Sequence, residues 1–379
     1  MAVSAALTDY RWPLACAAAL VALLVSLGAG GCETDERPGS QLSRVAPPAA
    51  GKLYHGVYPG GTTGEEDDIT REQVESYERA VGKNVAWVAF SHNWYRSTAF
   101  PRETAEWIRE MGSLPYVRLM LREEENRASD RFSLEAVLQG RLDAQLRAWG
   151  RGAREFGTPL IVEFGTECNG EWFPWNGLHH GAGRRDGFGD PGKPDGPERF
   201  AAAYRHIVEV VRGEGASNIT WVFHVDATDD PDVSWNRFEN YYPGDEYVDW
   251  VGVSAYGPQQ PTDDEAESFR EQMDGCYPRL ERLAKTKPVI VAEFGCTAGS
   301  PAARPEKWAA AALDGILGGR WPRVMGFSWW NERWENDDNP EHDTTMRVED
   351  TPALAAVFSE KLAGAAERIR ERPDLVGSG

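Results

Sequence analysis

Short apolar runs rich in β-branched and aromatic residues alternate, from residue 51 onwards, with longer segments whose apolar residues recur every three or four positions. The first pattern predicts buried strands and the second predicts amphipathic helices. The expected strands are residues 53–58, 84–91, 115–121, 159–165, 219–225, 248–256, 288–295 and 324–330. The expected helices include residues 71–82, 102–112, 134–157, 198–215 and 265–285, several of which end in glycine, as helix C-termini often do.

This alternation predicts a single α/β domain. Near-continuous apolar strands joined by helical crossovers indicate a parallel sheet that is covered on both faces. The sequence therefore predicts a (β/α)8 TIM barrel over residues 51–372. An open doubly wound sheet is the alternative fold. It would need a Gly-x-Gly-x-x-Gly loop after its first strand, and the stretch GVYPGGTTG at that point has no such spacing.

The N-terminal 50 residues follow a different pattern. Arg11 precedes an apolar run from Pro13 to about Gly30, which predicts an export signal. The run ends in LGAGGC, which resembles a bacterial lipobox although Ala29 replaces the usual leucine, so residues 1–32 are interpreted as a signal peptide with a lipidated Cys32. An ordinary cleaved signal with an incidental cysteine is the alternative. Residues 33–50 are polar, proline-rich and without periodicity, which predicts a flexible linker.

These segments predict an exported protein, either a lipoprotein of the cell surface or envelope or a secreted protein. We expect it to contact the membrane only through the lipid anchor and to be a monomer. Its formal net charge of −20 disfavours nucleic acid as a partner, because the phosphates would be repelled. No Cys/His spacing resembles a zinc site, and the acidic residues 335–343 lack an EF-hand pattern, so no metal or other cofactor is expected.

Acidic and aromatic residues gather where the expected strands end, and the active site of a TIM barrel lies at the C-terminal ends of its strands. Glu167 and the stretch EWFPW follow the fourth strand, Glu293 ends the seventh, and two tryptophans end the eighth. The chain has 15 tryptophans, and indole rings can stack against the CH faces of sugars while carboxylates bind hydroxyl groups. A Schiff-base lysine or clustered histidines, which an aldolase or amidohydrolase would need, are missing at these strand ends.

The segment ECNGEWFPW at residues 167–175 resembles the acid/base segment of glycoside hydrolase family 26, whose best-known members are endo-β-mannanases of the clan A retaining glycosidases. The resemblance implies that Glu167 is the catalytic acid/base and Glu293 the nucleophile. Tyr256 and a strand-three arginine such as Arg122 would keep Glu293 ionised. The substrate-binding residues would be His92, Trp94, Asn169, Trp172, Trp175, Tyr256, Trp329 and Trp330. Contact of His224 or Asp226 with substrate is not expected.

The resemblance implies an O-glycosyl hydrolase that cleaves a β-linked polysaccharide with retention, with β-1,4-mannan as the first substrate and β-glucan or xylan next. Two positions depart from the family pattern. A histidine before the acid/base and an arginine four residues before it are here Thr166 and Glu163. These changes weaken the inference of mannan more than that of hydrolysis, and they leave a carbohydrate-binding protein without turnover as the alternative.

Strand alternation places Glu163 on the same face as Glu167, one layer deeper in the barrel. A buried carboxylate needs a partner, and Arg118 on the third strand is the expected one.

Overall fold

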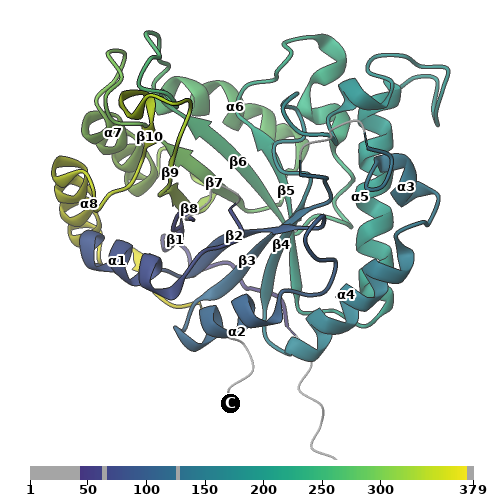
Figure 1. Cartoon of the computed structure of the whole chain (residues 1–379), viewed down its shortest axis with the longest axis horizontal. Coiled ribbons are helices and arrows are strands. Elements are labelled where there is room, and N and C mark those ends of the chain that lie inside the picture. The colour runs from purple at the N-terminus through teal and green to yellow at the C-terminus, as the bar shows by residue number, and fades with distance from the viewer. Residues whose placement is uncertain (1–42, 62–65, 125–128, 374–379) are drawn as a thin grey trace, which may run out of the picture. The chain divides into compact units, whose positions relative to one another are not determined.

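The computed structural model describes residues 43–61, 66–124 and 129–373, and these form a closed parallel barrel (Figure 1). Each strand pairs with the next, and the eighth pairs with the first, which confirms the TIM-barrel prediction. The strands are β1 (Leu53–Tyr58), β2 (Trp87–Asn93), β3 (Leu114–Met120), β4 (Leu160–Phe164), β5 (Ile219–Asp226), β6 (Trp250–Tyr256), β7 (Val289–Gly295) and β8 (Val324–Trp330). A short strand, β11 (Ile369–Arg370), pairs in parallel with the start of β1.

Helices surround the barrel strands in Figure 1. They are α1 (Arg71–Val81), α2 (Arg102–Glu110), α3 (Leu134–Leu138), α4 (Asp143–Phe156), α5 (Asp195–Gly213), α6 (Phe269–Leu283), α7 (Pro305–Gly318) and α8 (Pro352–Gly364). Short 3₁₀ turns lie at η1 (Gly177–His180), η2 (Ser234–Asn236), η3 (Phe238–Tyr241) and η4 (Pro340–His342).

Two of the differences from the expected helices have local causes. The segment expected as one helix over residues 134–157 is split into α3 and α4, with Gly140 between them in the left-handed region at φ 70°. Only glycine adopts that conformation without strain, so the helix breaks there. α6 starts later than expected because Ser268 caps it, in a reciprocal capping box with Glu271.

The lower part of the barrel is filled by aromatic side chains. Trp87 is fully buried, and its indole N–H donates to the hydroxyl of Ser328 at 2.6 Å. Gly56 makes room for it, because a Cβ on that residue would lie 2.0 Å from the Trp87 ring nitrogen. Trp250 packs beside Trp87, with ring centroids 6.4 Å apart. Part of the tryptophan surplus therefore belongs to the core, and the free space lies at the C-terminal ends of the strands.

The end of the expected linker is packed against the domain. The Arg44 guanidinium pairs with Asp249 at 2.6 Å, and the Val45 backbone N–H donates to the hydroxyl of Thr220 at 2.9 Å. Residues 43–50 therefore belong to the folded unit, whereas the signal segment and Cys32 lie outside the described residues. Among the helices of the described part, none is both long and apolar enough to cross a membrane.

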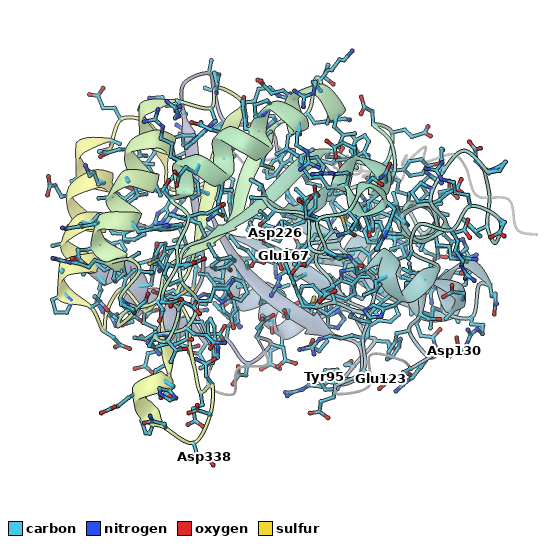
Figure 2. All side chains as sticks on the ribbon, turned by 90° about the horizontal axis from the view of Figure 1, so that it is seen from above. Tyr95, Glu123, Asp130, Glu167, Asp226 and Asp338 are labelled. Atoms are coloured by element: carbon cyan, nitrogen blue, oxygen red, sulfur yellow. The ribbon has the colours of Figure 1, made fainter. Side chains whose placement is uncertain are left out.

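The acidic residues 335–343 form a loop between β9 (Arg333–Trp334) and β10 (Thr344–Thr345), which pair antiparallel. Asp338 lies at the far end of this loop in Figure 2. Two of its carboxylates bind basic side chains of the same hairpin: Asp343 pairs with Arg333 at 2.9 Å, and Asp337 with His342 at 2.7 Å. These contacts tie the acidic loop to its own hairpin.

Candidate active site

Glu167 follows β4 at a sharp turn of the chain. Its φ of 49° lies in the left-handed region, which is rare for a residue other than glycine and often marks functional sites. The turn aims its carboxylate at the Trp172 indole, whose N–H donates to Oε2 at 2.7 Å. Gly170 permits this contact, because a Cβ there would lie 2.2 Å from the Trp172 ring. Glu167 and Trp172, both in the segment ECNGEWFPW, are therefore joined by a direct hydrogen bond.

Glu293 lies on β7 and is held by two donors. The Tyr256 hydroxyl donates to Oε2 at 2.8 Å, and the Arg118 guanidinium lies 3.3 Å from Oε1. Both contacts favour the ionised carboxylate. The arginine differs from the expected one, since Arg122 bonds the Asn93 side chain at 3.1 Å and lines a neighbouring cavity. Arg118 lies within β3 with its side chain buried in the barrel, whereas Arg122 comes after the strand has ended.

Arg118 also contacts Glu163, with 3.4 Å between Nε and Oε1, so the expected pairing is present. The two residues are register partners on β3 and β4. The Glu163 carboxylate further accepts hydrogen bonds from the hydroxyls of Tyr116, at 2.6 Å, and Thr166. Thr166 stands where family members have a histidine, and its hydroxyl donates a hydrogen bond to the buried Glu163 carboxylate.

A cleft of about 430 Å³ brings the two candidate catalytic carboxyls together. Figure 2 labels Glu167 and Asp226, which follow β4 and end β5, near the middle of the molecule. Five carboxyl groups and one guanidinium line the cleft among the described residues. The complete lining is Glu66, Arg118, Glu167, Trp172, Phe173, Asp226, Tyr256, Gln259, Glu293, Trp330, Glu332 and Trp334. Acidic and aromatic groups thus dominate its wall, as a carbohydrate site requires.

Trp330 is the aromatic residue of β8 that lines the cleft. Its ring stacks on Tyr58 with centroids 3.9 Å apart, and the Arg118 guanidinium lies 4.8 Å from its centroid. Trp334, from the short β9 strand, also lines the cleft. The sequence did not single out Trp334, because it lies beyond the last barrel strand in a segment without periodicity. Of the eight expected substrate-binding residues, the cleft includes Trp172, Tyr256 and Trp330.

Three expected aromatic contacts belong instead to the core, which corrects the prediction. Trp94 is buried edge-on against Phe132. Trp175 stacks on Phe173, and its N–H donates to the Thr166 carbonyl at 2.8 Å. Trp329 faces away from Trp330, as strand alternation requires, and donates to the Met346 carbonyl at 2.7 Å.

Two expected polar contacts are also structural. His92 is buried and accepts a hydrogen bond from the Trp149 indole at 3.3 Å. Asn169 is buried, and its side chain joins the loop after β4 to the end of β5. Its Oδ1 accepts from the Asp226 backbone N–H at 2.8 Å, and its Nδ2 donates to Asp229 Oδ1 at 3.0 Å. Asn169 therefore helps to place Asp226, which was not expected to reach the substrate, in the cleft beside Glu167.

Burial changes the acidity of the cleft carboxyls. It raises the pKa of Glu293 to about 7, although Arg118 acts in the opposite direction. Burial and the neighbouring charge of Asp226 raise the pKa of Glu167, and burial raises the pKa of Asp226 itself to about 6. Glu332 also lines the cleft. Burial and the neighbouring charge of Glu66 raise the pKa of Glu332 to about 8. Crowded carboxyls of this kind can hold a proton near neutral pH, as a general acid must.

One group of donor atoms has the composition of a metal site. Single ligand atoms of Glu163, His224 and Glu293 lie within 4.8 Å of one another. Both ring nitrogens of His224 are engaged by protein, at 2.8 Å from Glu163 and 2.8 Å from the Ser254 hydroxyl. Arg118 contacts both glutamates. The arrangement is explained as a network of ion pairs and hydrogen bonds within the barrel.

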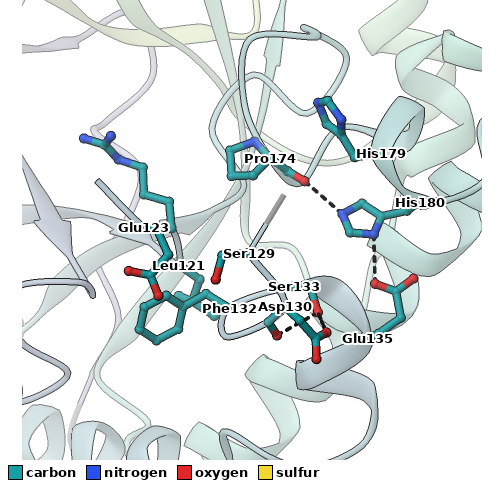
Figure 3. A pocket seen from close by; sticks show the side chains of 11 residues that line it. Leu121, Glu123, Ser129, Asp130, Phe132, Ser133, Glu135, Pro174, His179 and His180 are labelled. Atoms are coloured by element: carbon teal, nitrogen blue, oxygen red, sulfur yellow. Dashed lines mark hydrogen bonds and ion pairs between the residues drawn. The ribbon is translucent and has the colours of Figure 1, made fainter. Parts of the chain in front are cut away.

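A second cavity, of about 460 Å³, lies beside the end of β3 and the loop after β4 (Figure 3). Its lining contains none of the candidate catalytic groups. His180 is buried here and bridges the Glu135 carboxylate at 2.9 Å and the Pro174 carbonyl at 2.8 Å. This bridge fastens the loop that carries Trp172 to α3.

Comparison with known proteins agrees with the geometry. The family model described as glycosyl hydrolase family 26 matches residues 128–286, which include Glu167 and Tyr256. Endoglucanase H of Acetivibrio thermocellus is 24% identical over 314 residues, which cover 82% of this chain and 31% of that protein. Mannan endo-1,4-beta-mannosidase A and B of Caldalkalibacillus mannanilyticus is 28% identical over 179 residues, which cover 46% of this chain and 28% of that protein. The chain thus spans less than a third of the length of these curated relatives.

Among solved structures, the catalytic domain of the family 26 endo-β-1,4-mannanase from Bacillus sp. JAMB-750 has the same fold. It aligns with a TM-score of 0.58 and 17% identity, over 84% of this chain and 87% of that chain. The matches confirm the resemblance to family 26 that the acid/base segment indicated, and the structural alignment shows the shared fold.

Proposed function

We propose that this chain, a protein similar to glycosyl hydrolase family 26, is a retaining glycoside hydrolase that cleaves a β-linked polysaccharide. One observation carries the proposal: two buried carboxyls, one just after β4 and one on β7, share one aromatic cleft, and each has donors suited to its role. Glu293 is contacted by Arg118 and Tyr256, and Glu167 by Trp172. The names of the relatives, an endoglucanase and mannan endo-mannosidases, support a β-glycan substrate. We place β-1,4-mannan first and β-glucan or xylan next.

The mechanism follows from these contacts. The Glu293 carboxylate attacks the anomeric carbon while Glu167 donates its proton to the departing glycosidic oxygen, which leaves a glycosyl ester on Glu293. The ester carries no negative charge, so Glu167 becomes more acidic and is then a base. It takes a proton from water, the water oxygen attacks the anomeric carbon, and the Glu293 carboxylate is released. Two displacements at one carbon retain its configuration.

Turnover on a panel of soluble glycans tests this function. We expect the purified protein to release new reducing ends from at least one of β-mannan, β-glucan and xylan. The alternative is a carbohydrate-binding protein without turnover. Affinity electrophoresis in gels that contain the same glycans tests it, because binding to the glycan slows migration. Retarded migration with no new reducing ends from any glycan would favour that alternative and contradict hydrolysis.

We also propose that the protein is displayed at the cell envelope, where it would meet polymeric substrate, through a lipid on Cys32. The proposal rests on the apolar segment and the LGAGGC motif. Cys32→Ala is expected to move the protein from the membrane fraction to the soluble fraction of its host, with Cys16→Ala as the control that leaves it membrane-bound. Unchanged membrane association of Cys32→Ala would reject the lipid anchor.

A further inference from the structure

Alternate residues of the segment that leaves β8 line the cleft. Trp330, Glu332 and Trp334 all belong to its lining, and these three residues form the β8 wall. The residues between them, Asn331 and Arg333, are absent from that lining: Asn331 is buried elsewhere, and Arg333 is exposed to solvent. Successive side chains of an extended chain point to opposite faces, so the strand alternation of β8 continues past its end.

Backbone hydrogen bonds hold the outer part of the β8 wall against a second strand. The Glu332 carbonyl accepts from the Met346 N–H at 2.8 Å, and Trp334 is the register partner of Thr344 in the antiparallel β9–β10 pair. An extended chain rises by about 3.3 Å per residue, so the two tryptophans of the wall are spaced by up to about 13 Å. That spacing leaves room for more than one sugar ring along the wall.

The indole N–H groups of the β8 wall are both bound to protein acceptors. Trp330 donates to Glu332 Oε2 at 3.0 Å, and Trp334 donates to Asn336 Oδ1 at 3.1 Å. The Asn336 amide in turn donates to the Thr344 hydroxyl at 2.8 Å, which fixes the edge of the Trp334 indole to β10. Trp334 is half-buried, so part of its ring is accessible. Since the N–H is occupied, contact with a sugar is left to the ring face, on which the apolar CH face of a β-linked pyranose can stack.

Barrel topology indicates which part of a substrate reaches the β8 wall. β8 is the neighbour of β7, which carries Glu293, and it lies on the opposite side of the closed barrel from β4, which Glu167 follows. In the proposed mechanism the sugar that becomes esterified is bound at Glu293, whereas Glu167 meets the departing oxygen. The glycone therefore extends along the β8 wall, and the leaving group lies on the side of β4.

We propose that Trp334 is a specificity-determining residue whose ring stacks on the second glycone sugar, one ring beyond the sugar that Glu293 attacks. The inference rests on the proposed function and deepens it. The preferred substrate supplies at least two glycone sugars in an extended chain, as a β-1,4-linked glycan does. Binding energy from the remote sugar lowers the barrier at the reacting carbon, so the effect appears in kcat/KM.

The test compares glycosides that differ only in the length of the glycone: 4-nitrophenyl β-mannoside, β-mannobioside and β-mannotrioside, and the matching series from β-glucoside to β-cellotrioside. In wild type, kcat/KM should rise steeply from the monosaccharide to the disaccharide glycoside. Trp334→Ala should lower the ratio of these two values by about 10- to 100-fold, the effect of losing an aromatic anchor. All members of a series share one leaving group, so the ratio reports the glycone alone.

Two variants serve as controls. Trp334→Phe keeps a ring face for stacking and should retain most of the wild-type ratio. Trp107→Ala removes a partly buried indole from α2, outside the lining of the cleft, and should leave the ratio at its wild-type value. If Trp334→Ala does not fold, Trp334→Leu keeps apolar volume without a ring and should show the same fall in the ratio.

A wild-type ratio in the alanine or leucine variant would overturn the platform while the hydrolase proposal stands. A loss confined to unmodified oligosaccharides would place Trp334 on the leaving-group side and would overturn it too. If wild type hydrolyses no glycan or glycoside, the hydrolase proposal fails, and calorimetric titration with mannotriose and cellotriose tests the platform without turnover. Weaker binding by Trp334→Ala than by wild type would support the platform, whereas equal affinity, or no binding by either protein, would overturn it.

Discussion

Glu293→Ala is expected to lower kcat for a β-glycan by at least about 10⁴-fold, because the covalent route loses its nucleophile and each factor of ten corresponds to 1.36 kcal/mol of barrier. The substitution also opens a space between Arg118, Tyr256 and the anomeric carbon of the substrate. A small external anion such as azide or formate can enter that space and attack the same face. Partial recovery of turnover is therefore expected, with a glycosyl azide of inverted configuration as the product.

Glu293→Gln is the matched control. It removes the charge but keeps the volume of the side chain, so it should be as inactive as the alanine variant and should gain nothing from azide. The fold should tolerate both changes, because Arg118 keeps its contacts with Glu163 and Glu66. Activity of Glu293→Ala close to wild type, or equal rescue of both variants, would contradict the assignment.

The second large effect concerns Glu167→Ala. Loss of the acid should slow the first displacement by about 10²–10⁴-fold for a glycan, whose leaving group needs a proton. Aryl β-glycosides with a good leaving group such as 2,4-dinitrophenolate need no proton for its departure, so they should still react. Since the second displacement lacks its base, the glycosyl-enzyme should accumulate, and mass spectrometry should detect it as a covalent adduct on Glu293.

Asp226 provides a sharp control, since it lies beside Glu167 in the cleft and its own pKa is raised to about 6. Asp226→Asn should slow glycans and activated aryl glycosides to a similar extent and should accumulate no adduct. If Asp226→Asn shows the strong dependence on leaving group and Glu167→Ala does not, Asp226 is the acid and the present assignment is wrong.

The barrel could be predicted because its pattern is repeated. Every expected strand is present, with ends that differ by at most three residues, since apolar runs buried on both faces have few other interpretations. The two candidate catalytic carboxyls were found for a related reason: barrel topology brings the C-terminal ends of all strands to one face, so Glu167 and Glu293 had to meet there.

The aromatic residues that line the cleft were harder to predict, because their direction depends on loop geometry that the sequence does not encode locally. Trp172 and Trp175 are three residues apart, yet one contacts the acid and the other supports the loop from beneath. Strand alternation indicates that the Trp329 and Trp330 side chains point to opposite faces of β8, but it does not indicate which of them faces the cleft. Glu66 reaches Arg118 from the loop after β1, where no periodicity marks it.

The anomeric configuration of the first product tests the central claim most directly. Wild-type protein is mixed with a soluble β-glycan at high enzyme concentration, and proton NMR follows the new reducing ends before mutarotation equilibrates them. Double displacement at Glu293 predicts that the β anomer appears first and the α anomer follows only at the rate of mutarotation. Initial appearance of the α anomer would mean a single displacement by water and would contradict the nucleophilic role of Glu293.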